Sequence, residues 1–137
     1  GRVAAGALWL VRGDAGQRAV AAWHTGWEPA QRVSGTDWMP PVLAPLLDDS
    51  YAAVRFIVNQ SARRLPGLSE WKNEFDGPPA QRKESRGRMS EWWLKSGGRV
   101  TPRKGLESLF DREGKLRPGE VEKVWRTRDQ HAVRVEE

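Results

Sequence analysis

The first part of the chain contains two apolar blocks separated by a glycine-flanked turn. Residues 7–12 and 18–24 are apolar at nearly every position, and Gly13 and Gly16 lie in the segment between them. Because glycine adopts positive φ at little cost, this arrangement favours an antiparallel β-hairpin. Apolar residues on both faces of each strand indicate that the hairpin is covered on both sides. The pattern predicts an α+β fold, with an N-terminal antiparallel β-hairpin or small sheet packed by several short helices.

Helical spacing of apolar residues begins in the middle of the chain. Residues 39–47 predict a short helix, since their prolines fall where a first helical turn accepts them. Apolar side chains at every third or fourth position predict a second helix over 51–65, capped by 48–50. A strand over 54–58 is the alternative, because β-branched and aromatic residues alternate there. We favour the helix because the apolar stripe continues to Leu65.

The second half of the chain predicts a mainly helical arrangement interrupted by a flexible basic loop. The loop covers 76–90, because 80–87 contain no apolar residue larger than alanine. At this length we expect a single domain over 1–137. The remaining elements predicted are helices over 68–75, 90–95 and 120–125, a charged turn at 113–115, and a final strand over 132–135.

Tryptophan dominates the aromatic residues of this chain. The sequence has eight tryptophans, one tyrosine, three phenylalanines and no cysteine. Tryptophan serves either as a core anchor or as a recognition surface, and core burial is the more frequent outcome for any single ring. The absence of cysteine excludes disulfides, thiolate zinc sites and cysteine nucleophiles. We find no sequence motif for a cofactor, a metal or a catalytic residue, and we expect none of them.

No segment of the sequence predicts contact with a membrane. No apolar run approaches the roughly 20 residues that cross a bilayer, and the start lacks the charged and apolar regions of a signal peptide. We therefore expect an intracellular protein, in the cytoplasm, the nucleoid or the nucleus. The chain opens with Gly1 rather than methionine, which predicts a trimmed chain or a piece of a longer polypeptide.

Cationic residues are concentrated in one segment of the second half. Residues 80–104 contain eight cationic and two acidic side chains, a local charge of +6, whereas the whole chain carries +5. The first sixty residues are neutral, with five arginines and five acidic residues. Such a block attracts polyanions and makes their binding depend on salt. A solvated face that keeps the chain in solution is the alternative.

Two adjacent tryptophans lie inside this basic segment. Lysine and arginine bind phosphates, and indole rings stack on exposed bases, so the segment holds the residue types that a nucleic-acid strand requires. The sequence predicts a nucleic-acid-binding module for single-stranded or structured DNA or RNA, an accessory domain of a larger replication, packaging or regulatory protein. The predicted site residues are Arg82, Lys83, Arg86, Arg88, Trp92, Trp93, Lys95, Arg99, Arg103 and Lys104.

Two other functions remain open. Exposed tryptophan and arginine side chains are also typical of protein interfaces, so a domain that docks an acidic protein partner is the main alternative. The second alternative is a metal-dependent nuclease, because Asp48 or Asp49 followed by Glu70 and Lys72 has the residue types of a restriction-type site. We give the nuclease little weight, since these residues are predicted on a helix rather than on adjacent strands.

A histidine stands between two tryptophans near the end of the predicted hairpin. His24 lies between Trp23 and Trp27, where an imidazole could act as a general base or a pH-sensitive donor. No carboxylate or nucleophile accompanies it in a matching local pattern. We therefore expect His24 to be a hydrogen-bonded structural residue.

Overall fold

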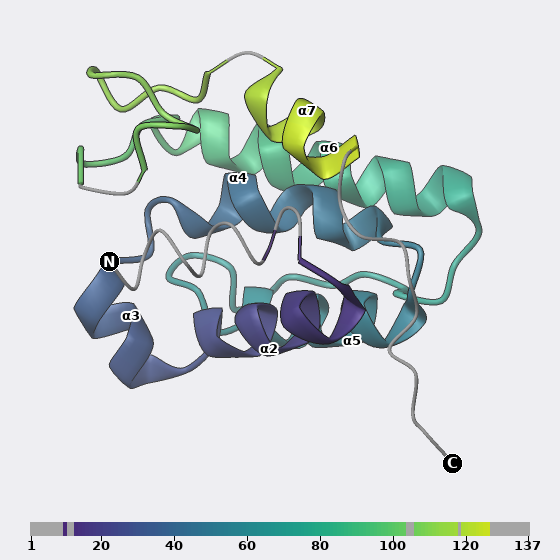
Figure 1. Ribbon diagram of the computed structural model, residues 1–137. Coiled ribbons are helices and arrows are strands. Elements are labelled where there is room, and N and C mark those ends of the chain that lie inside the picture. Colours follow the sequence, from purple (N-terminus) through teal and green to yellow (C-terminus); the bar gives the residue numbers. More distant parts are fainter. Residues whose placement is uncertain (1–9, 11–12, 104–105, 118, 127–137) are drawn as a thin grey trace.

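The described part of the molecule is built of helices (Figure 1). The computed structural model describes residues 10, 13–103, 106–117 and 119–126. None of the helices in these residues combines the length and the apolar character that a bilayer span needs. The elements are α2 (Ala15–Thr25), α3 (Glu28–Ser34), α4 (Met39–Leu43), the 3₁₀ helix η1 (Ala44–Asp48), α5 (Ala52–Ala62), α6 (Pro79–Lys95) and α7 (Glu120–Arg126).

The helices pack as a stack around one core. Helix α2 packs along α5, α5 packs against η1, and η1 packs against α6, while α4 also touches α5 and α6. Figure 1 shows the same order, with α2 and α5 on one side, α4 in the middle and α6 on the other side. Leu43, Leu46, Val58 and Met89 are fully enclosed in this core. Helices α2 and α6 therefore lie on opposite sides of the stack, and α7 lies next to α6, where Glu122 pairs with Arg86 (Figure 1).

The predicted β-hairpin is wrong where the structure describes it. Helix α2 occupies the expected turn and the second strand. Its first turn is closed by a capping box, in which Asp14 accepts a hydrogen bond from the Gln17 N–H at 2.7 Å and Gln17 accepts one from the Asp14 N–H at 3.0 Å. The first strand, residues 7–12, lies outside the described residues apart from the buried Leu10.

The α+β class is therefore corrected to a helical fold. Among the described residues, the only β-pairing is an isolated antiparallel bridge between Phe110 and Leu116. Four of the eleven residues of α2 are alanine, which has the highest helix propensity. A run of consecutive small apolar residues is typical of a strand that is covered on both faces. When those residues are alanines, the same run is equally compatible with a helix.

The helices predicted in the middle of the chain are confirmed. The first, over 39–47, is formed by α4 and η1. The second is α5, and the strand alternative over 54–58 is wrong. The predicted cap at 48–50 is wrong, because the N-cap of α5 is Tyr51 and no side chain caps the helix; Asp49 instead accepts a hydrogen bond from the N–H of Tyr51 itself.

Near the C-terminal end, α7 confirms the predicted helix over 120–125. The predicted charged turn over 113–115 is confirmed as well, with Gly114 at a φ of +80°. The final strand predicted over 132–135 lies outside the described residues.

The helix predicted over 68–75 is absent, and its residues form turns and irregular backbone. Side chains of other elements bind the carbonyl groups that a helix would have used. Arg63 Nε donates to the carbonyl oxygen of Trp71 at 3.0 Å, and Arg88 Nη2 donates to that of Lys72 at 3.1 Å. These bonds satisfy backbone acceptors without helical pairing.

The predicted flexible loop over 76–90 is mostly helix, since α6 begins at Pro79. A proline at the first helical position and the following glutamine, arginine, lysine and glutamate residues all favour a helix. The buried side chains of α6 are Ser85, Met89 and Trp93, at a spacing of four residues. Because a serine opens this stripe, the apolar period was too short to predict the whole helix. Helix α6 ends before Gly97, as predicted.

Candidate functional site

The two tryptophans of the predicted nucleic-acid site lie largely inside the fold. Trp93 is only 5% exposed, and its Nε1 donates to the carbonyl oxygen of Asp37 at 2.9 Å. Trp92 is partly buried and packs against the core. Its ring covers Gly67, where an added Cβ would lie 2.9 Å from the indole. Neither ring therefore presents a fully open plane on which a base could stack.

Four predicted cations of this segment are bound to carboxylates of the same chain. Their partners lie on η1, on α7, on α6 itself and in the turn before α4. The pairs are Arg82 with Asp48 at 3.4 Å, Lys95 with Glu91 at 2.9 Å, Arg103 with Asp37 at 2.6 Å, and Arg86 with Glu122.

The other predicted cations are spread further. Arg88 lies over the ring of Trp71, with its guanidinium carbon 4.7 Å from the ring centroid. Lys83 and Arg99 are exposed. Lys104 lies outside the described residues.

Asp37 joins the C-terminal loop to the first half of the chain. Its carboxylate accepts hydrogen bonds from Arg103 at 2.6 Å and from the N–H of Thr101 at 2.8 Å. Burial alone would raise the pKa of Asp37, but these two donors outweigh burial and lower its pKa below the ordinary 3.8. The nearby indole of Trp93 binds the Asp37 carbonyl oxygen. The ion pair of Arg103 with Asp37 therefore holds the loop at residues 101–103 against the first half of the chain. This structural role explains the position of Arg103 without a bound ligand.

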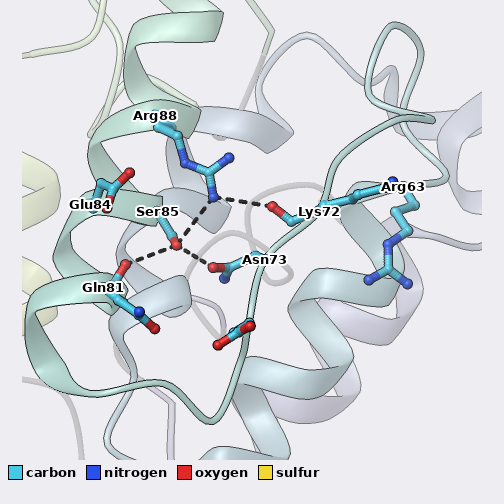
Figure 2. A pocket seen from close by; sticks show the side chains of 8 residues that line it. Arg63, Lys72, Asn73, Gln81, Glu84, Ser85 and Arg88 are labelled. Atoms are coloured by element: carbon cyan, nitrogen blue, oxygen red, sulfur yellow. Dashed lines mark hydrogen bonds between the residues drawn. The ribbon is translucent and has the colours of Figure 1, made fainter.

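Figure 2 shows a polar pocket between the 72–74 segment and the first half of α6. Its volume is about 390 Å³. The buried hydroxyl of Ser85 lies at its centre, within hydrogen-bond reach of Asn73 Oδ1, the Gln81 carbonyl oxygen and Arg88 Nη2. Asn73 Nδ2 is buried and has no hydrogen-bond partner. The lining residues are Arg63, Lys72, Asn73, Glu74, Gln81, Glu84, Ser85 and Arg88. Because cationic and acidic side chains both line the pocket, it does not favour a ligand of either charge.

A second feature is an exposed aromatic face on the outer side of the stack. Trp23 and Trp27 stack with ring centroids 6.1 Å apart and planes inclined by 24°. The edge of His24 meets both rings, at 5.2 and 5.9 Å. Val20, one helical turn before Trp23, is 49% exposed, and the two tryptophans are 52% and 44% exposed. We call Val20, Trp23, His24 and Trp27 the aromatic face.

The aromatic face carries no charged side chain of α2. Arg18 is the only arginine, lysine, aspartate or glutamate of that helix, and it is fully buried against Asp49. His24 Nδ1 lies 2.9 Å from the carbonyl oxygen of Val20, so the expected hydrogen-bonded role of His24 is confirmed. Spacings of three and four residues from Val20 to Trp27 would have revealed this face, had the segment been recognised as a helix.

The residues considered for a nuclease are used differently. Asp49 is buried in a salt bridge with Arg18 at 2.8 Å, and Asp48 pairs with Arg82. Glu70 is exposed on a turn. Across the described ranges, no three histidine, cysteine, aspartate or glutamate side chains gather in a way that could hold a metal ion. This geometry gives the nuclease hypothesis no support.

Known proteins do not supply a family for this chain: no family model matches it, and neither the curated proteins nor the solved structures contain a match.

Proposed function

We propose that this protein is a protein-interaction domain that docks an apolar helical surface of a partner through the aromatic face of α2. The observation that carries the proposal is the exposed, stacked pair Trp23–Trp27. Trp38, Trp71 and Trp93, by contrast, are buried. Covering the exposed half of each ring removes roughly 100 Å² from water, which contributes on the order of 2–3 kcal/mol per ring before the costs of association.

The chemistry of the aromatic face favours a protein over a nucleic acid. Centres of protein interfaces are enriched in tryptophan and depleted in charge. A phosphate backbone needs cations beside the stacking rings, whereas α2 exposes none, and Arg64, which lines a hollow with Trp27, shares that hollow with the acidic Glu28. Since the inner side of α2 already packs on α5, its outer side is placed to receive a further helix. A partner with an apolar helical stripe satisfies these conditions.

The proposal is tested by crosslinking from the face itself. A photoreactive phenylalanine analogue replaces Val20 in one variant and Phe56 in a matched control, because Phe56 is an exposed apolar residue of α5 outside the aromatic face. In an extract of the source cells we expect a discrete crosslinked partner from position 20 and none from position 56. Changing both Trp23 and Trp27 to serine is expected to abolish the crosslink while the helical circular dichroism stays unchanged.

Equal crosslinking from both positions, or an unchanged crosslink in the double-serine variant, would contradict the proposal. A crosslink between two copies of the chain would identify a second copy as the partner. Sedimentation velocity at several protein concentrations measures this outcome directly.

Nucleic-acid binding is the second candidate, supported by the +6 charge of residues 80–104 and by the exposure of Lys83 and Arg99. Without a fully open tryptophan plane in this segment, binding would rest on phosphate contacts and would fall steeply with salt. Fluorescence anisotropy of labelled single-stranded DNA, RNA and duplex at several salt concentrations tests it. Flat titrations at low salt would remove this candidate.

A further inference from the structure

A groove runs along α6 where residues 115–117 pass beside it. Two adjoining hollows form it, with volumes of about 410 and 130 Å³. They share Pro41, Ser90 and Leu116 in their linings, so they lie side by side. We call this feature the α6 groove.

The larger hollow combines an apolar floor with a cationic rim. Trp93, Leu94 and Leu116 contribute apolar surface, and Gly97 and Gly98, which follow α6, line the hollow without side chains. Arg99 and Lys115 are its charged lining residues, and both are exposed. Among the described residues, no carboxylate lines this hollow. Its volume falls within the range of about 300–1,000 Å³ that is usual for ligand pockets.

The smaller hollow continues the positive charge. Arg86 and Arg117 line it, and Glu122 is its only acidic lining residue in the described part of the chain. The carboxylate of Glu122 is paired with Arg86. Arg117 is anchored, since its Nε donates to the carbonyl oxygen of Glu107 at 2.7 Å. The α6 groove therefore has an excess of positive charge along its whole length.

We propose that the α6 groove binds an acidic peptide segment of a partner protein. An apolar side chain of the peptide lies in the larger hollow, and carboxylates beside it pair with Arg99 and Lys115. Charge complementarity selects the acidic sequence, and the apolar floor selects one large aliphatic or aromatic residue within it. The groove lies on α6, at the opposite end of the stack from the aromatic face, so the inference does not depend on docking at α2.

A peptide fits the groove better than a nucleic acid does. Base stacking needs an exposed ring plane, but the Trp93 ring is almost fully buried beneath the hollow. The surface that remains is formed mainly by aliphatic atoms, including the 64% exposed Leu94. An apolar side chain is the group that gains most from leaving water at such a surface.

The test uses a fluorescein-labelled peptide with one leucine between pairs of glutamates, measured by anisotropy. Two matched peptides replace the leucine with glycine or the glutamates with glutamine. We expect binding of the parent peptide and at least tenfold weaker binding of either matched peptide. An oligothymidylate of similar length, labelled in the same way, measures binding of a nucleic acid.

The groove variant combines Arg99→Glu with Lys115→Glu. The control variant combines Lys72→Glu with Lys83→Glu, which makes the same charge change at exposed positions that do not line the groove. We expect at least tenfold weaker peptide binding by the groove variant and less than threefold by the control. If the charge reversals unfold the groove variant, Arg99→Gln with Lys115→Gln replaces it.

The inference is overturned by equal weakening in the groove and control variants, by binding that does not need the leucine, or by absence of peptide binding. Tighter binding of the oligothymidylate, lost in the groove variant, would assign the groove to nucleic acid instead. The Trp23→Ser, Trp27→Ser variant is expected to bind the peptide as the parent chain does. Failure at the α6 groove is thus distinguishable from failure of the proposed docking at α2.

Discussion

The buried salt bridge between Arg18 and Asp49 leads to the most quantitative prediction. Both side chains are fully buried. The guanidinium binds the carboxylate through two hydrogen bonds, at 2.8 and 3.1 Å, and Arg18 Nη1 also donates to the carbonyl oxygen of Gly13 at 2.6 Å. Asp49 accepts a further hydrogen bond from the N–H of Tyr51. The pair joins α2 to the segment between η1 and α5, which sets the position of the aromatic face.

Replacing Arg18 with methionine keeps much of the buried volume and removes the positive charge. The carboxylate of Asp49 then stays buried without its ionic partner, which typically destabilises a protein by about 3–5 kcal/mol. Small domains are stable by only about 5–15 kcal/mol, so a large fraction of the total is lost. Changing Asp49 to asparagine as well removes the stranded charge, and we expect the double variant to be more stable than the sum of the two single effects allows.

Urea unfolding followed by tryptophan fluorescence measures these free energies. The control is Arg32→Met, because Arg32 forms an exposed helical pair with Glu28 at 3.9 Å, for which a change within about 0.5 kcal/mol is expected. A loss below about 1 kcal/mol for Arg18→Met would refute the reasoning that an unpaired buried charge is costly here. Strict additivity in the double variant would refute the direct coupling of Arg18 and Asp49.

Three further predictions concern stability. Gly114→Ala should destabilise the fold by about 2 kcal/mol or more, because the φ of Gly114 is +80° and an added Cβ would clash with the backbone carbonyl oxygen of Val100. Gly87→Ala should stabilise the fold by about 0.5–1 kcal/mol, because Gly87 lies on α6 with open space around it. Thermal melts of the two variants and the parent chain measure both changes. The lowered pKa of Asp37 stabilises the fold above its ordinary pKa of 3.8, and this contribution is lost as the pH falls further through the folded-state pKa. Urea titrations below pH 4 should therefore show a shallower loss of stability in Asp37→Asn than in the parent chain, and equal slopes would contradict this. Trp93→Ala should cost about 3–5 kcal/mol in urea unfolding and the exposed Leu94→Ala within about 0.5 kcal/mol, so similar losses would contradict the burial assigned to these neighbours.

The sequence predicted helices correctly where the spacing of the apolar residues agreed with the positions of the prolines and glycines. The stripe that ends at Leu65 and the prolines of residues 39–47 predicted helices that the structure contains. Helix α2 was missed because alanine is compatible with both periods, so the apolar count alone could not separate helix from strand. The capping box of Asp14 and Gln17 was the local signal that distinguishes them.

The candidate site was predicted from residue type, and residue type does not specify which side of a helix a side chain occupies. Trp92 and Trp93 are neighbours in sequence and belong to the long helix α6, in which Trp93 is buried and Trp92 packs partly buried against the core. The pairing of Arg103 with Asp37 joins positions 66 residues apart, which no local pattern contains. Local charge density predicted where cations are concentrated, whereas long-range pairing decides which of them face a ligand.

The unlike ends of the helical stack limit how this molecule can assemble. One end presents the uncharged aromatic face of α2, while the outer side of α6 exposes Leu94 among the charged side chains Lys83, Glu84, Glu91 and Lys95. Head-to-tail addition would press an indole surface onto these solvated ammonium and carboxylate groups, and their desolvation opposes that contact. An open fibre, which requires both ends to join, is therefore disfavoured, and growth from α2 closes after one neighbour.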